Sequence, residues 1–377
     1  MPCDDWARGA ARIVTGMQHI GAPPTSSHHA TTNQGNDIMA TLAAPGTTQE
    51  TISAPSTTEP VERRIIVADV LGYCWGVRRA VDIISDAASP KSRIAPIGDI
   101  IHNPQVVDRL RERGVVGSSS VAEAKEQGFS RVAITAHGMG PHLAVEAEQQ
   151  GLELIDTTCP LVTKVQRLAQ KLVRQGYFLV VYGDSYHPEV KSVLGWAATT
   201  KAVAAKKVED LPWNAKRGEK GEGKIVPPRK VALVSQTTKN IDELMAFSAQ
   251  LQAMVVPEGG EFRLCNTICE PTTERQNALR RMVDQVDLVL AIGGRKSSNT
   301  ARLADVGNSL GVTSYHIERP EDIKPEWLEG VTNVGVTAGA STPDDVIQDV
   351  VDHLAAQGFT PPEGGIRPVD PDYVPAF

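Results

Sequence analysis

Residues 156–165, DTTCPLVTKV, place a cysteine directly before a proline at the predicted start of a helix. Pro160 suits the first helical position, where its missing N–H costs nothing. A cysteine before a helical pattern occurs twice more, at Cys74 in LGYCWGVRRAVDII and at Cys269 in NTICEPTTERQNALRRMV. Each thiol is therefore expected near a helix N-terminus, where the helix dipole and free N–H groups favour a thiolate.

The polar loops that follow these cysteines are equally spaced. The interval is 28 residues in each case, from Cys74 to His102, from Cys159 to His187 and from Cys269 to Ser297. Further along each part, a strand-like run ends in TAHGMG, SQTTKN or TAGAST. These endings place His137, Thr237 and Ser341 at the carboxyl ends of strands, where open α/β sheets bind ligands. The equal spacing indicates a threefold internal repeat.

Short β-branched runs alternate with helical patterns from Arg63 onward, which predicts an α/β fold with largely parallel sheets. With the repeat, this predicts a pseudo-threefold arrangement of three related α/β units whose cysteines converge on the axis. We expect the units at 61–158, 159–265 and 266–360, each with one of the three cysteines. A disordered low-complexity extension is expected at 1–60 and a Pro-rich tail at 361–377.

The composition limits the class of protein. The 41% hydrophobic and 22% charged residues are typical of a soluble globular protein. The sequence has no apolar run of the roughly 18 to 20 residues that span a bilayer and no secretory signal, so we expect a cytoplasmic protein without a membrane partner. The net charge of −7 argues against nucleic-acid binding. The basic stretch 216–230 is expected to be a solvated surface insert.

Five cysteines are too few for a disulfide framework in so long a chain, and no C-x2-C pair predicts structural zinc. Buried thiols, a catalytic thiol or a metal site assembled from distant segments remain. Three thiolates suit zinc with an open fourth position, which activates water. They equally suit a [4Fe–4S] cluster with one iron that lacks a protein ligand. Cys265, which no helix follows, is expected to be a small buried residue.

A set of neutral or switchable hydrogen-bonding side chains is predicted around the cavity: His102, His137, His187, Thr237, Ser297, Ser298, Asn299 and Ser341. Such a rim suits an anion with many oxygens, such as a phosphate or diphosphate. Neither a G-x-x-x-x-G-K-[ST] loop nor a G-x-G-x-x-G fingerprint is present. Glu189 is the one carboxylate inside a rim loop. It either relays protons or only favours the start of its helix through the dipole.

The ordered motifs GYCWGVRRAV, IIHN, AHG, DTTCPLVTKV, HPEV, SQTT, TTERQ, SSNTARL and VGVTAGASTPD resemble those of the 4-hydroxy-3-methylbut-2-enyl diphosphate reductase (IspH/LytB) family. The resemblance runs from about Ile65 to Asp344. It implies a trefoil of three α/β domains around a central [4Fe–4S] iron–sulfur cluster. It further implies the last step of the methylerythritol phosphate route to isoprenoids.

The resemblance also implies a role for each matching residue. The cluster ligands would be Cys74, Cys159 and Cys269. The diphosphate would be held by His102, His137, His187, Ser297, Ser298, Asn299 and Ser341. Thr237 and Glu189 would orient the substrate hydroxyl and supply its proton. Two electrons would arrive singly from a ferredoxin or flavodoxin, water would leave, and isopentenyl and dimethylallyl diphosphates would form.

Two alternatives accompany this interpretation. The first is a zinc hydrolase acting on a phosphorylated small molecule, which would be colourless and stable in air. The second is an iron–sulfur sensor or scaffold that changes conformation when its cluster is lost, which would be indifferent to diphosphates.

Overall fold

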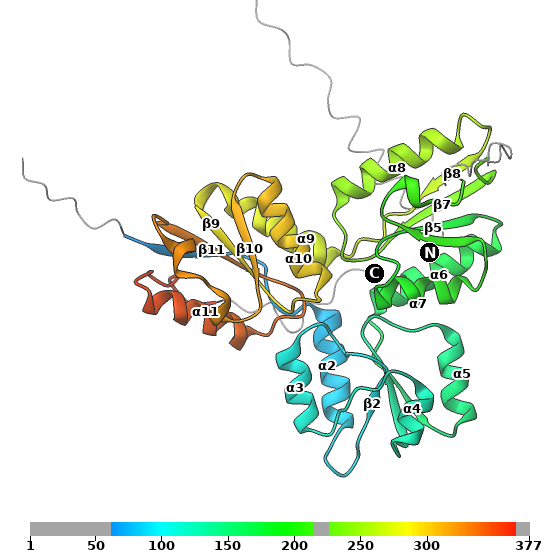
Figure 1. The fold of residues 1–377 in the computed structure, drawn as a ribbon, viewed down its shortest axis with the longest axis horizontal. Helices are drawn as coiled ribbons and strands as arrows, with labels where there is room; N and C mark the ends of the chain where they lie inside the picture. The colour runs from blue at the N-terminus through cyan, green and yellow to red at the C-terminus, as the bar shows by residue number, and fades with distance from the viewer. Residues whose placement is uncertain (1–61, 214–225, 367–377) are drawn as a thin grey trace, which may run out of the picture. The chain divides into compact units, whose positions relative to one another are not determined.

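Three separate parallel sheets, each with helices on both faces, make up the described part of the chain (Figure 1). The computed structural model describes residues 62–213 and 226–366. These belong to the unit Thr58–Phe377, and the other unit, Met1–Thr57, lies outside the described residues. The predicted extension at 1–60, residues 216–225 of the predicted insert and residues 367–377 of the predicted tail also lie outside them.

The first sheet has the strand order β2 (Ala95–Pro96), β3 (Arg131–Ile134) and β4 (Glu153–Asp156). Helices α2 (Trp75–Ala87) and α3 (Pro104–Glu112) pack on one face through Ala133. Helices α4 (Val121–Glu126) and α5 (Pro141–Gln149) pack on the other face through Val132. Neighbouring residues of a strand point to opposite faces, so β3 is buried on both sides.

The second sheet has the order β6 (Ala202–Ala205), β5 (Phe178–Tyr182), β7 (Lys230–Ser235) and β8 (Glu261–Leu264). Helices α6 (Pro160–Arg174) and α7 (Pro188–Ala197) cover one face. Helix α8 (Ile241–Val255) and the 3-10 turn η1 (Val208–Asp210) cover the other. The described end of the predicted insert leads directly into β7, which begins at Lys230.

The third sheet has the order β1 (Arg64–Val67), β11 (Asn333–Ala338), β9 (Leu288–Ile292) and β10 (Thr313–Ile317). Helices α9 (Glu270–Met282) and α10 (Ser298–Ser309) lie on one face. Helix α11 (Asp344–Ala356) and the 3-10 turns η3 (Pro320–Asp322) and η4 (Pro325–Leu328) lie on the other, and η2 (Val283–Gln285) follows α9.

Strand β1 departs from the predicted division of the chain. It lies within the segment expected to form the first unit, but it pairs with β11 of the third sheet, Ile65 opposite Val334. In an α/β fold a strand can join a sheet formed by a distant part of the chain, because it needs only a parallel neighbour, wherever in the chain that neighbour lies. The sequence pattern shows that a strand is present but not which sheet it joins.

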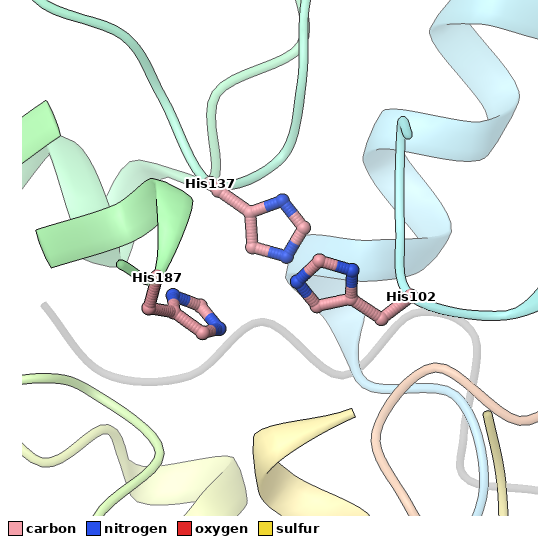
Figure 2. A group of neighbouring side chains, drawn as sticks. All are labelled: His102, His137 and His187. Atoms are coloured by element: carbon pink, nitrogen blue, oxygen red, sulfur yellow. The ribbon is translucent and has the colours of Figure 1, made fainter. Parts of the chain in front are cut away.

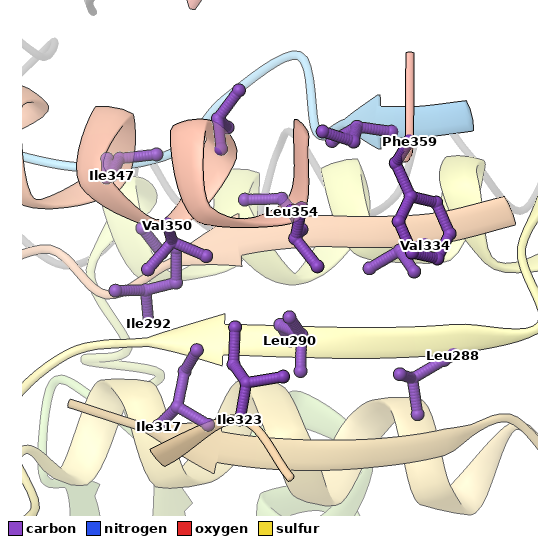
Figure 3. Close-up of a cluster of buried hydrophobic side chains, with 14 of the residues drawn as sticks. Leu288, Leu290, Ile292, Ile317, Ile323, Val334, Ile347, Val350, Leu354 and Phe359 are labelled. Atoms are coloured by element: carbon purple, nitrogen blue, oxygen red, sulfur yellow. The ribbon is translucent and has the colours of Figure 1, made fainter. Parts of the chain in front are cut away.

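The core of the third sheet explains why its strands read as continuous apolar runs. Leu288, Leu290 and Ile292 of β9 face α11, and Figure 3 shows them packed below Val350 and Leu354. Val289 and Ala291 face the opposite layer, against α9 and α10. Both faces of the strand are buried, as parallel sheets require, and the predicted α/β class with parallel sheets is confirmed. None of the helices in the described residues is long and apolar enough to cross a membrane.

Candidate functional site

The predicted functional residues meet in one cavity, although they come from segments belonging to all three sheets. The cavity lining includes all of them: Cys74, His102, His137, Cys159, His187, Glu189, Thr237, Cys269, Ser297, Ser298, Asn299 and Ser341. Apolar side chains such as Val77, Ile101 and Leu161 complete the wall. The threefold spacing of the sequence therefore corresponds to a threefold contribution to a single site.

The three cysteines occupy equivalent positions, each as the N-cap of a helix with extended backbone: Cys74 for α2, Cys159 for α6 and Cys269 for α9. Their backbone N–H groups donate to carbonyl groups near the ends of three strands, at distances of 3.1, 3.0 and 3.0 Å to Ala340, Ala136 and Thr237 respectively. Each thiol is thus fixed beside one of the strand-end loops that the sequence singled out.

The three cysteine sulfurs are not all within 4.8 Å of one another. A Cβ added at Gly76, in the first turn of α2, would lie only 2.4 Å from Cys159 Sγ, so this turn packs directly on that thiol. Among the described residues, the group whose ligand atoms all lie within 4.8 Å of one another is the histidine triplet, and the cysteine triplet is not such a group. Zinc with Zn–S bonds of about 2.3 Å needs sulfurs within roughly 4.6 Å. In this geometry the three sulfurs therefore do not form a ready-made site for one zinc ion.

Burial disfavours the ionised thiolate form of the cysteines, which the helix N-termini were expected to favour. Desolvation, with like charge on Cys74 and Cys269, raises the pKa of Cys159 to about 12, and N–H groups of Leu161 and Val162 only partly offset this. Desolvation likewise raises the pKa of Cys269 to about 12. For Cys159 and Cys269 the loss of water around the thiol therefore outweighs the effect of the helix terminus.

Three histidine rings form a compact cluster at the rim (Figure 2). His102 and His137 are stacked, with ring centroids 4.2 Å apart and planes 30° apart. His187 stands edge-on to both, at 5.3 Å from His102 and 5.5 Å from His137. Their ligand nitrogens lie within 4.8 Å of one another. Three rings that can each donate an N–H are therefore held together at one end of the cavity.

Burial keeps these imidazoles neutral at neutral pH. Desolvation lowers the pKa of His187 to about 4, and the nearby His102 contributes. Desolvation also lowers the pKa of His102, and it lowers that of His137 well below the usual value. A neutral imidazole donates from one nitrogen and accepts at the other. The rim therefore offers oriented hydrogen bonds rather than fixed positive charge.

Several buried polar atoms of the rim have no hydrogen-bond partner within the described residues. These are both ring nitrogens of His102 and both amide atoms of Asn299, which is only 4% exposed. Buried polar groups are nearly always paired, and leaving one unpaired costs about 1–3 kcal/mol. Because these side chains line the cavity, the missing partner is expected to be a ligand with several oxygens.

Glu189 and Thr237 form a buried pair. The Thr237 backbone N–H donates to Glu189 Oε1 at 2.7 Å and its hydroxyl donates to Oε2 at 2.8 Å. Glu189 is 2% exposed, and desolvation raises the pKa of its carboxyl despite these two bonds. A carboxyl that retains its proton to higher pH is suited to act as an acid. Its place on the cavity wall distinguishes it from an ordinary helix-start glutamate.

The loops that carry the rim serines contact the loop that carries His102. Ser341 Oγ lies 3.5 Å from the His102 carbonyl, and a Cβ at Gly294 would lie 2.2 Å from the same oxygen. Ser298 Oγ accepts hydrogen bonds from Thr238 Oγ1 at 3.1 Å and from Gln236 Nε2 at 3.3 Å. Loops from the three sheets therefore interlock around the cavity, which fixes the rim geometry.

Three residues near the site were not singled out from the sequence. Thr238 and Thr272 line the cavity, and Thr272 Oγ1 lies 3.1 Å from Cys269 Sγ. Arg275 is 1% exposed, donates to the carbonyls of Gly72 and Pro271, and interacts electrostatically with the thiols of Cys74 and Cys269. The doubled threonines of SQTT and PTTE were the available signal for the first two. No spacing rule indicates that Arg275 turns inward.

Cys265, expected to be a small buried residue, is only partly buried. It packs against the core on the α6 and α7 face of the second sheet. It directly follows β8, and its N–H donates to the Leu233 carbonyl at 2.8 Å. This hydrogen bond extends the pairing of β8 with β7 at the edge of the second sheet.

Comparison with known proteins supports the family that the motifs suggested. The sequence matches the family described as LytB protein over residues 65–355. Relatives named 4-hydroxy-3-methylbut-2-enyl diphosphate reductase include that of Citrifermentans bemidjiense, 37% identical with 78% of this chain and 97% of the relative covered. The Aquifex aeolicus relative of the same name is 36% identical, with 76% and 94% covered.

Solved structures agree. A structure of (E)-4-hydroxy-3-methyl-but-2-enyl diphosphate reductase, described as the terminal enzyme of the non-mevalonate pathway, is 34% identical with a TM-score of 0.54 and covers 78% of this chain and 99% of that one. The Plasmodium falciparum E-1-hydroxy-2-methyl-but-2-enyl-4-diphosphate reductase, 24% identical with a TM-score of 0.70, covers 80% of this chain and 91% of that one and shows the same fold. The chain therefore belongs to the LytB protein family.

Proposed function

We propose that this protein is a 4-hydroxy-3-methylbut-2-enyl diphosphate reductase, which forms isopentenyl and dimethylallyl diphosphates at the end of the non-mevalonate route. The observation that carries the proposal is the single cavity in which all twelve predicted residues meet. Relatives that carry this name are covered over 94–97% of their own length. The alignment therefore extends across the whole relative and not only across one shared domain.

Cys74, Cys159 and Cys269 would hold a [4Fe–4S] cluster with one iron free of protein ligands. Three soft sulfur donors at equivalent helix starts suit iron–sulfur chemistry, and in this geometry they do not form a ready-made site for one zinc ion. Such a cluster, when bound, supplies single electrons and a Lewis-acidic iron. Arg275 interacts electrostatically with two of these thiols, so its guanidinium would offset the negative charge of a thiolate-bound group. The pseudo-threefold trefoil, with units close to 61–158, 159–265 and 266–360, forms part of this proposal.

The rim would bind the diphosphate. The ring N–H of His102 and the amide N–H₂ of Asn299, which have no partner among the described residues, gain acceptors when phosphate oxygens enter the cavity. His137, His187 and Ser341 line the same cavity, as do Ser297 and Ser298. Hydrogen bonds to a charged group are worth about 1.5–3 kcal/mol each, so a rim of neutral donors is sufficient to hold the anion. The rim also shields the negative charge of the diphosphate from the reacting carbons.

Glu189 would supply a proton and Thr237 would orient the substrate hydroxyl beside it. The reaction breaks the allylic C–O bond, consumes two electrons and two protons, and releases water. One proton joins the departing oxygen and the other joins carbon. The Thr237 hydroxyl, held by Glu189 Oε2, links the buried carboxyl to the cavity. Burial raises the Glu189 pKa, so the carboxyl retains its proton to higher pH than an exposed glutamate does.

Ferredoxin or flavodoxin in the cytoplasm is proposed as the electron donor. The test is purification without oxygen, followed by iron and sulfide analysis and by product assay with the hydroxylated diphosphate and reduced methyl viologen. We expect about four irons and four sulfides per chain, with both isoprenoid diphosphates formed. Cys159→Ser should lose the iron. A normal iron content in that variant would contradict the ligand set.

The same measurements decide between the proposal and its rivals. Stoichiometric zinc in protein never exposed to air, with release of phosphate, would favour the zinc hydrolase. Iron and sulfide without any binding of diphosphate would favour the sensor or scaffold. The unpartnered polar atoms of the rim argue against the sensor, since a protein that binds no anion gains nothing from burying them.

A further inference from the structure

A second cavity lies outside the functional site and is predominantly basic. Its lining includes Arg79 from α2 and Thr163, Lys164 and Arg167 from α6, with Asp156 as its one carboxylate. Asp156 is already engaged, because its Oδ1 accepts the Thr158 backbone N–H at 2.8 Å. This feature, the basic groove, therefore presents positive charge on a chain whose net charge is −7.

The basic groove and the functional site share one short segment of backbone. Thr158 and Pro160 line the groove, while Cys159 between them lines the site cavity. The Thr158 carbonyl also accepts a hydrogen bond from Arg79 Nη1 at 3.2 Å. A molecule seated in the groove is therefore separated from the Cys159 thiol by little more than the main chain that carries it.

The positive charge continues along α6 beyond the groove. Lys164, Arg167, Lys171 and Arg174 are all exposed, and their spacing of three, four and three residues places them on one face of the helix. Val162, Val165, Ala169 and Leu172 face the core instead. The exposed face of α6 is thus a basic stripe that begins near Cys159.

Ordinary helix electrostatics explains only part of this stripe. Lys171 and Arg174 lie in the last turn, where the dipole favours cations. Lys164 and Arg79 are each the fifth residue of their helices, α6 and α2, in the N-terminal half, where the dipole gives a cation no stabilisation. Within the described residues, no ion pair neutralises Arg79, Arg167, Lys171 or Arg174. Their positive charge remains available to a partner.

We propose that the basic groove and the adjoining face of α6 are the docking surface for a small acidic electron-carrier protein. This rests on the proposed reductase function. Each docking event would oxidise one carrier by one electron, so two events supply the two electrons that C–O cleavage consumes. Electron transfer weakens steeply with distance, and the groove is where the surface reaches the backbone of a proposed cluster ligand. Complementary charge speeds such encounters, and electron-transfer interfaces are typically small and weak.

A competing explanation is that these cations only offset the charge of the metal group inside the protein. In that case their removal would alter the enzyme equally with every electron donor. The docking proposal requires instead that the defect be confined to an acidic protein donor and shrink as salt screens the contact.

The test uses the oxygen-free holoenzyme and the double variant Arg167→Glu/Lys171→Glu. The control, Lys91→Glu/Lys201→Glu, makes the same change in net charge at exposed residues that neither line the groove nor lie on α6. The probes are an acidic ferredoxin, for binding in its oxidised form and for turnover in its reduced form, and methyl viologen as a small donor that needs no docking site.

We expect the α6 variant to lose roughly 10- to 100-fold in ferredoxin binding and in kcat/KM with reduced ferredoxin at low salt. The loss should shrink at high salt, and the methyl viologen rate should equal that of wild type. The control should match wild type throughout. Unchanged ferredoxin binding in the α6 variant, or an equal loss in the control or with methyl viologen, would overturn the proposal. Wild-type protein inactive with methyl viologen would instead refute the reductase function, while ferredoxin binding still tests the surface.

Discussion

The three rim loops begin at the same distance from their cysteines but do not have the same helix register. His187 is the N-cap of α7 and Ser297 the N-cap of α10, whereas in the first loop the N-cap of α3 is Asn103 and His102 precedes it. The residues that precede the other two caps, Tyr186 and Lys296, have highly exposed side chains, whereas His102 lines the cavity. Equal spacing in the sequence thus conceals an offset of one residue.

Because of this offset, the three side chains differ in how many of their hydrogen-bonding atoms remain available to a ligand. The His187 ring accepts the Glu189 N–H at Nδ1 over 3.2 Å, so one nitrogen is committed to the cap. Ser297 Oγ accepts the Thr300 N–H at 3.3 Å in the same way. His102 caps nothing, and both its nitrogens are without partners among the described residues. In the proposed site, the first loop therefore contributes a residue that is free for the ligand alone, and the other two contribute residues that also cap a helix.

The largest expected effect concerns the second helical position, where the three loops carry Gln105, Glu189 and Asn299. Glu189→Gln keeps the size of the side chain and one acceptor for Thr237, but it removes the acidic proton. We expect turnover to fall about 10²- to 10⁴-fold with iron content and diphosphate binding retained. Gln105→Ala is the matched control, since within the described residues the Gln105 side chain bonds only the Glu318 carbonyl, and its turnover should stay near wild type. A Glu189→Gln enzyme at full rate would remove this residue from the mechanism.

The second-largest effect distinguishes a residue that would only bind the ligand, His102, from one that also caps a helix, His187. His102→Ala should weaken diphosphate binding by about 10- to 150-fold, the loss of one hydrogen bond to a charged group. Its free energy of unfolding should fall less than that of His187→Ala, because the change removes the stacking on His137 but no hydrogen bond among the described residues. Calorimetric titration with the diphosphate and urea unfolding measure the two quantities. A His102→Ala protein that binds normally would show that the first loop lies outside the anion site.

His187 should behave differently. His187→Ala should lose affinity and also about 1 kcal/mol of folding free energy, because the α7 cap is lost. His187→Asn should recover the stability but not the affinity, since asparagine is a good N-cap and lacks the imidazole. Equal stability of the Ala and Asn variants would contradict the proposed difference between the loops.

A pH titration of stability tests the same histidine. The unfolded state binds a proton below the usual histidine pKa of 6.5, whereas burial delays this in folded His187 to about 4. Unfolded protein therefore binds more protons between these values, and stability should fall as the pH drops from about 6.5 to 4. His187→Asn should fall less steeply over that window in urea unfolding followed by circular dichroism. An identical slope in both proteins would be inconsistent with a low His187 pKa.

The smallest effect is expected at the exposed equivalent of His102. Tyr186 is 84% exposed, so Tyr186→Ala should change the unfolding free energy by no more than about 0.5 kcal/mol and leave diphosphate affinity unchanged. A clear loss of affinity would mean that the second loop, like the first, turns its pre-cap residue toward the ligand.

The residues that line the candidate site could be predicted from the sequence more completely than the pairing of the strands. Cysteines and histidines are chemically distinctive, and their 28-residue intervals alone are enough to group His102, His187 and Ser297. The partner of β1 was beyond reach, because parallel pairing depends on contacts far apart in the chain. The inward turn of Arg275 was equally hidden, since its partners are two backbone carbonyls that carry no residue-specific signal. The one-residue offset at Asn103 becomes visible only when the three helix starts are compared in space.

The central claim is that the cysteine-lined end and the polar rim belong to one site, with one iron of the cluster open to the substrate. Mössbauer spectra of ⁵⁷Fe-enriched protein, recorded without oxygen before and after addition of the hydroxylated diphosphate, test it most directly. A signal from one iron in four that changes on addition, while the other three stay constant, is the predicted result. Spectra that do not change although the diphosphate binds would contradict the claim and separate the metal centre from the anion site.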